Sequence, residues 1–84
     1  MDNKNSLYTK VLMGKYRKVA LQVMTHKLQT TNKIRKLMEK KTGKAINWHF
    51  LFKVLDRLEE EGKIEKVEAN RLFLWKLGEM KKKQ

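Results

Sequence analysis

The stretch from Asn47 to Leu77 constrains the fold most, because its hydrophobic period changes partway along. Four apolar residues are spaced i, i+3, i+4 and i+7, which predicts one buried stripe on a helix: Leu51, Val54, Leu55 and Leu58. After Gly62 the period falls to about two, which predicts strands over 63–68 and 71–77. The turn between them is expected near Ala69-Asn70, since Asn tolerates positive φ. A helix followed by a β-hairpin is therefore expected.

Both ends of this helix, over 47–61, carry recognisable signals. Asn47 is a good N-cap, because its side chain can accept from the free amides of the first turn. Ile46 before the cap and Leu51 can close a hydrophobic staple. Gly62 is expected to end the helix, since Gly enters the left-handed conformation without steric cost.

An earlier helix is predicted from about Lys15 to Lys27. Its apolar residues are spaced i, i+3, i+4, i+7 and i+8: Tyr16, Val19, Ala20, Val23 and Met24. The segment from Leu7 to Met13 could extend this helix or form a strand, because Gly14 costs about 1 kcal/mol inside a helix. Residues 1–6 are polar and expected to fray.

A second helix is predicted after the polar break Gln29 to Asn32. Thr30 or Thr31 can cap it, and Gly43 is expected to stop it. Its apolar stripe is short: Ile34, Leu37 and Met38. Because a short Gly-containing turn joins it to the helix at 47–61, the two form a predicted helix-turn-helix. Residues 79–84 are expected to be a basic tail.

The composition fits one basic domain over 1–84. The formal net charge is +12, with 21 Lys plus Arg against 9 Asp plus Glu, so an anionic partner is expected, nucleic acid before membrane. The absence of Cys excludes disulfides and thiolate metal sites. No apolar run is long enough to span a bilayer, and the N-terminus lacks the apolar core of a signal peptide. We therefore expect the protein to remain in the cytoplasm.

The segment Val54 to Glu65 carries a resemblance to a known superfamily. Its order of apolar, Leu, polar, acidic, Gly and Ile residues resembles the end of the recognition helix in winged-helix transcription factors. PadR-like and MarR-like regulators carry this pattern, as do small DNA-binding proteins of archaea and their viruses. The resemblance implies an α+β winged helix-turn-helix, with three helices and a C-terminal two-stranded hairpin as the wing. It also implies a homodimeric transcriptional regulator on double-stranded DNA, in the nucleoid or, for a viral chain, the host cytoplasm.

The outward face of the helix 47–61 carries the expected base contacts. His49, Lys53 and Arg57 are spaced i, i+4 and i+8. By the resemblance, Asn47, His49, Phe50 and Lys53 lie at bases or sugars, and Arg57 nearer a phosphate. Glu59, Glu60 and Glu61 are expected to point away from DNA. The alternative is a solvated face, with Arg57 paired to Glu60 or Glu61. Backbone contacts are expected from Lys33, Lys36, Lys44, Lys66 and, at the hairpin tip, Arg71.

The aromatic residues are assigned mainly to the core. Trp48 shares a helical face with Leu51 and Leu55, so burial is favoured over stacking on a sugar or inserting at a base step. Phe52 is expected to be half-buried. In the second strand, one face should point to the core: Phe73, Trp75 and Leu77. Leu72 and Leu74 have the opposite parity, which indicates a second surface.

Catalysis finds no support, and no metal, cofactor or small-molecule effector is expected. The two histidines, His26 and His49, stand apart in sequence without a carboxylate cluster. Two other functions compete with a regulator: an architectural protein that coats DNA without sequence preference, and a winged helix used for protein contact. A homodimer is expected because apolar residues exceed what so small a domain can cover: Leu7, Tyr8, Val11 and Leu12 before the core helix, and Leu72 and Leu74 on the outer face of the wing. Since regulators of the resembled class commonly dimerise through terminal helices, the interface is expected on the N-terminal segment.

Overall fold

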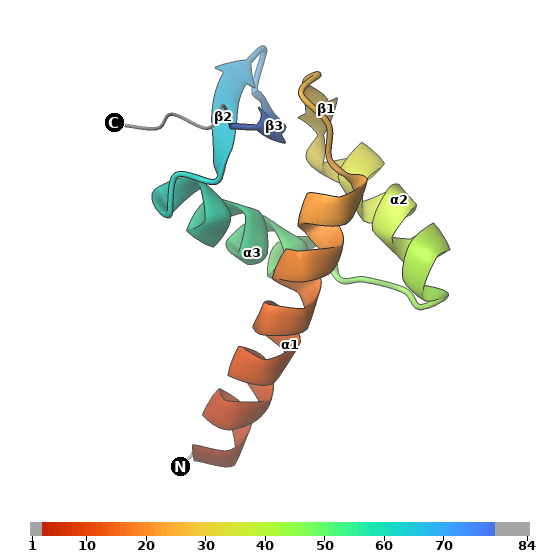
Figure 1. Ribbon diagram of the computed structural model, residues 1–84, viewed down its shortest axis with the longest axis vertical. Helices are drawn as coiled ribbons and strands as arrows, with labels where there is room; N and C mark the ends of the chain where they lie inside the picture. The colour runs from red at the N-terminus through yellow and green to blue at the C-terminus, as the bar shows by residue number, and fades with distance from the viewer. Residues whose placement is uncertain (1–2, 79–84) are drawn as a thin grey trace.

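The computed structural model describes residues 3–78, with side chains from Lys10 onward, as a small α+β domain (Figure 1). Over this part of the chain it has three helices and one antiparallel sheet with the strand order β1-β3-β2. The N-terminal half of α1 extends away from the rest of the domain, and the sheet lies at the opposite end. The elements are α1 (Asn3–Val23), β1 (Gln29–Thr30), α2 (Thr31–Thr42), α3 (Trp48–Glu60), β2 (Ile64–Ala69) and β3 (Leu72–Leu77).

Helix α1 is longer at its start and shorter at its end than the sequence predicts. It begins at Asn3, so the segment 7–13, left open between helix and strand, is helical. The predicted end at Lys27 is wrong, since the helix stops at Val23. The cause is tertiary: the Thr25 carbonyl accepts from the Leu77 amide at 2.8 Å, and the Thr25 amide donates to the Gln29 side chain at 3.2 Å. These bonds tie the chain to the end of β3 instead of continuing the helix.

Helix α2 begins and ends where its caps predict. The Thr30 hydroxyl accepts from the Lys33 amide at 3.0 Å, which satisfies one of the free first-turn donors. Gly43 has φ 74°, and its amide donates to the Glu39 carbonyl at 2.7 Å. Ile34 and Met38 are fully buried.

Helix α3 confirms the predicted cap and stop. The Asn47 side chain accepts from the Phe50 amide at 2.9 Å. After the helix, Gly62 has φ 79° and donates to the Glu59 carbonyl, while Lys63 donates to the Leu58 carbonyl, both at 3.0 Å. This pair of bonds is the Schellman arrangement, which gives the last carbonyls partners and turns the chain into β2.

The sheet differs from the predicted hairpin in two ways. Positive φ occurs at Asn70 (50°) and Arg71 (67°), so the turn lies one residue later than Ala69-Asn70. Two successive positive φ values are typical of a type I′ turn, whose twist matches that of the strands. The second difference is β1, a segment expected to be an unpaired polar break. It pairs with β3 through Gln29↔Trp75 and Thr30↔Leu74, so the sheet has three strands instead of two.

Trp75 is the largest fully buried side chain of the domain. Its indole Nε1 donates to the Thr31 hydroxyl at 2.8 Å. Thr31 is the one buried polar or charged residue in the described part of the chain. The bond joins the last strand to the first residue of α2. The remaining core comes from all three helices and β2: Ala20, Met24, Ile34, Met38, Ile46, Leu51, Val54, Leu55, Leu58 and Ile64.

Replacing Thr31 with Val keeps the shape of the side chain but removes the acceptor for the Trp75 indole. A buried donor left without a partner costs about 1–3 kcal/mol, so we expect Thr31→Val to lower the free energy of unfolding by that amount. Urea denaturation would measure it. In a double-mutant cycle with Trp75→Phe, the two losses should be less than additive, whereas simple additivity would contradict the bond.

Candidate nucleic-acid interface

The positive charge of the chain is concentrated in its first half. Residues 1–46 contain 12 Lys and Arg against 2 Asp and Glu, whereas residues 47–78 contain six of each. The expected recognition helix and the hairpin are therefore close to neutral together. The excess of positive charge therefore lies mainly on α1 and α2.

Helix α2 presents a row of exposed lysines, which we call the lysine row: Lys33, Lys36, Lys40 and, just after the helix, Lys44. The first three are spaced i, i+3 and i+7, so they share one face. The only carboxylate of α2, Glu39, accepts instead from Arg35 at 3.0 Å and from the Ile46 amide at 2.8 Å. Within residues 10–78 no member of the lysine row forms an ion pair.

The outward face of α3 carries both signs of charge. His49 and Lys53 are exposed, as predicted. Lys53 lines a cavity of about 350 Å³ together with Met13, Asp56, Arg57 and Glu60. The expectation that Glu60 points away from this face is wrong, because positions 49, 53, 56 and 60 follow the helical repeat on one side. Lys53 therefore sits beside two carboxylates.

Phe50 and Arg57 both lie toward α1. The Phe50 ring is half-buried and meets the Tyr16 ring edge-on at 5.4 Å, so it packs against α1 instead of standing free on the outward face. The reason is its spacing of four residues before Val54, which puts it on the flank of the buried stripe. Arg57 Nε lies 3.9 Å from Glu60, as in the alternative weighed for it. Glu61 pairs with Arg17 of α1.

Of the other residues expected to contact DNA, some are exposed and others already bond within the domain. Asn47 is exposed, with its side-chain oxygen engaged in the helix cap. Lys66 donates to Asp56 at 3.1 Å, and its ammonium lies 5.2 Å from the centre of the Phe73 ring and 5.7 Å from that of Trp75. Lys66 is thus held within the domain by charge and by the ring faces. Arg71 is exposed at the hairpin tip, where it was expected.

Trp48 is 41% exposed, which contradicts the expected burial. It opens the first turn of α3, beyond the stripe that the other elements cover, so sharing a face with Leu51 does not bury it. Its ring stacks on Phe52 with centroids 5.2 Å apart, and Phe52 in turn meets Phe73 at 5.3 Å and Trp75 at 5.5 Å. Phe52 is half-buried, as predicted.

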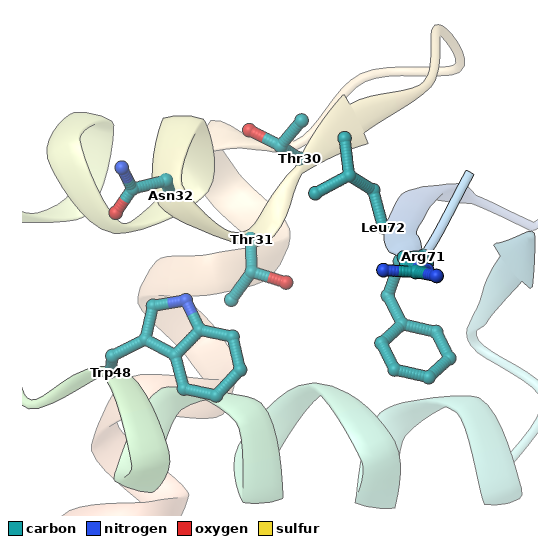
Figure 2. Close-up of a pocket in the computed structure, with 7 residues that line it drawn as sticks. Thr30, Thr31, Asn32, Trp48, Arg71 and Leu72 are labelled. Carbon is teal, nitrogen blue, oxygen red and sulfur yellow. The ribbon is translucent and has the colours of Figure 1, made fainter. Parts of the chain in front are cut away.

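A pocket of about 440 Å³ opens beside Trp48. Figure 2 shows Trp48 on one side of the opening, Arg71 and Leu72 on the other, and Thr31 between them. The pocket brings together the start of α2, the start of α3 and the hairpin tip. No sequence signal predicts this, because it depends on the pairing of β1 with β3. The lining is Thr30, Thr31, Asn32, Trp48, Arg71, Leu72 and Phe73.

Comparison of the chain with protein-family models, curated proteins and solved structures finds no match. Among the residues that the structure describes, no group of three or more His, Asp or Glu side chains could hold a metal ion. None of the helices in that range combines the length and apolar character needed to cross a membrane. The function is therefore inferred from the domain's own geometry and charge.

Proposed function

We propose that this protein is a winged-helix domain that binds double-stranded DNA, with α2 and α3 as the helix-turn-helix and the β2–β3 hairpin as the wing. The observation that carries the proposal is the lysine row, an exposed cationic face with no ion-pair partner among residues 10–78. Clustered exposed cations are what recognition of a phosphate backbone requires. The row begins at the end of α2 that adjoins Trp48 and the hairpin tip.

In this arrangement phosphate contacts and base contacts come from different elements. The lysine row and Arg71 hold the two edges of the bound surface by their charge. Between them, the exposed first half of α3 offers His49 and Lys53 to base edges in the major groove. We propose a transcriptional regulator on this basis, with α3 supplying sequence preference.

An architectural DNA-coating function is the second candidate, and one observation favours it. Asp56 and Glu60 flank Lys53, and carboxylates near a phosphate backbone oppose deep entry of the second half of α3. If only the lysine row and the wing engage the duplex, binding is strong at low salt and indifferent to sequence.

Removing the cations of the lysine row tests the phosphate contacts. We expect Lys36→Ala and Lys40→Ala each to weaken binding to every duplex alike and to reduce the salt dependence, as the slope of log K against log salt, by about one per lysine. Fluorescence anisotropy at several salt concentrations would measure both. Lys66→Ala is the matched control, because Asp56 already holds that ammonium. An unchanged slope in both lysine-row variants would exclude the row from the interface.

Lys53→Ala separates the two candidate functions. A base-edge contact is worth about 1–3 kcal/mol of discrimination, so the variant should lose that much at a site selected from a random duplex pool and less on random DNA. The exposed side chain makes the fold insensitive to this change, whereas Leu55→Ala should cost about 2–5 kcal/mol of stability through a core cavity. Equal losses on selected and random DNA would support the architectural function.

We also propose that the protein forms a homodimer, with the interface on the sheet instead of on the N-terminal segment. An interface along α1 would bring together two helices that each carry Lys and Arg without Asp or Glu. The outer face of the sheet carries an apolar patch between the Glu65–Lys76 ion pair and the hairpin tip, with Val67 38% and Leu72 54% exposed. We expect Val67→Asp, at an exposed residue of this face outside the pocket beside Trp48, to shift the species seen by sedimentation at micromolar concentration from dimer to monomer. A wild-type protein that sediments only at about the mass of one 10.1 kDa chain would contradict the dimer.

A further inference from the structure

We propose that the pocket beside Trp48 binds an unpaired nucleobase of a nucleic-acid strand, a site that rests on the proposed DNA binding and extends it beyond the regular duplex. The pocket is lined at one side by Trp48 and at the other by Arg71 and Leu72 (Figure 2). Its volume, about 440 Å³, lies within the range of about 300–1,000 Å³ that is typical of small-ligand sites.

Trp48 is an exposed aromatic ring whose position is fixed by its neighbours. The indole stacks on Phe52 at 5.2 Å with an interplanar angle of 28°, and His49 meets it edge-on at 5.4 Å. Through Phe52 the ring is continuous with the buried Trp75. A rigid aromatic surface that borders an open pocket is suited to a flat π-system, because stacking then orders few additional side-chain torsions.

The polar groups of the pocket suit the edge of a base. The Asn32 side-chain oxygen accepts from Arg35 at 3.1 and 2.8 Å, so its amide nitrogen is the part left to donate outward. The Thr30 oxygen accepts from the Lys33 amide, which leaves its hydroxyl proton as a donor. Both donors lie at the start of α2. Base carbonyl and ring-nitrogen acceptors match this set.

The position of Arg71 adds a cation at the mouth of the pocket. Its φ of 67° lies in the left-handed region, which Gly occupies without steric cost and Arg does not. Residues held in sparsely populated backbone conformations are frequent at ligand sites, and Arg71 places its side chain at one wall of this pocket. The guanidinium suits a phosphate of the strand that presents the base.

The surrounding charge selects a strand over an uncharged aromatic ligand. The lysine row begins beside Asn32, one residue from the pocket lining, and continues along α2. A strand whose phosphates follow these lysines brings its bases past Trp48. A fully paired duplex keeps its bases stacked inside, so the pocket is filled only where a base is unpaired or extruded.

Two matched duplexes test the proposal: a fully paired 20-mer and the same duplex with one unpaired nucleotide. We expect the wild-type protein to bind the second about tenfold more tightly, in line with the strength of base–aromatic stacking, and to lose Trp48 fluorescence on binding. Trp48→Ala should abolish the preference and leave the paired duplex unaffected. Leu28→Ala, at an exposed apolar residue outside the pocket, is the control that should change neither.

Arg71→Gly provides a second test that remains valid even where Trp48→Ala does not fold. Gly suits the backbone at this position, so the unfolding midpoint should not fall. Binding to both duplexes should weaken because a phosphate contact is lost, and the loss should be several-fold larger for the duplex with the unpaired nucleotide, whose base lies beside Arg71. Equal wild-type affinity for both duplexes, or an equal effect of Trp48→Ala on both, would overturn the pocket assignment. A free nucleoside monophosphate that quenches Trp48 as effectively as the strand would overturn the strand as the ligand.

The two proposals fail in different ways. A protein that binds the paired duplex without preferring the unpaired nucleotide retains the proposed function and loses the pocket. A protein that binds only the duplex with the unpaired nucleotide, in a manner that requires Trp48, retains the pocket and loses the proposed double-stranded target.

Discussion

The hydrogen bond from Trp75 to Thr31 connects the parts of this domain that sequence order keeps apart. Trp75 pairs with Gln29 across β1 and β3, and its indole reaches the first residue of α2 in the buried interior. The same ring packs near Phe52 of α3. In a domain of 84 residues with a limited core, one residue whose backbone pairs with β1 and whose ring contacts two helices fixes where α2 begins relative to the hairpin. The pocket beside Trp48 exists because of that placement.

The local parts of the fold could be predicted from the sequence because their causes are local. Asn47, Gly43 and Gly62 act on backbone groups within four or five residues, so cap and stop signals place α2 and α3 correctly. Strand β1 could not be predicted, because two residues carry no period and become a strand only through β3. The early end of α1 has the same origin, since the Thr25 carbonyl is taken by Leu77.

The candidate site was less predictable than the fold, because it depends on the direction in which each side chain points from α3 and on what covers it. Lys53 and His49 are exposed as expected, yet Glu60 follows them on the same face and Phe50 turns toward α1. Trp48 shows the limit of periodicity most clearly. A helical stripe buries a residue only where another element covers it, and the first turn of α3 lies beyond that cover. Only the tertiary arrangement shows which end of a stripe is left uncovered.

The separation of charge between the two halves of the chain implies an order of events in binding. If the proposed DNA binding holds, the cations of α1 and α2, which act over roughly a Debye length, about 8–10 Å at physiological salt, would draw the duplex toward the domain before contact. The α3 and hairpin surface is close to neutral in net charge, so under the same proposal it would act mainly at contact. Attraction would then be sensitive to salt and indifferent to sequence, while discrimination would arise at short range. Because α3 and the hairpin together have little net charge, attraction to phosphates, which is the same for every sequence, would add little to their contacts. Differences in affinity between sequences would then remain measurable.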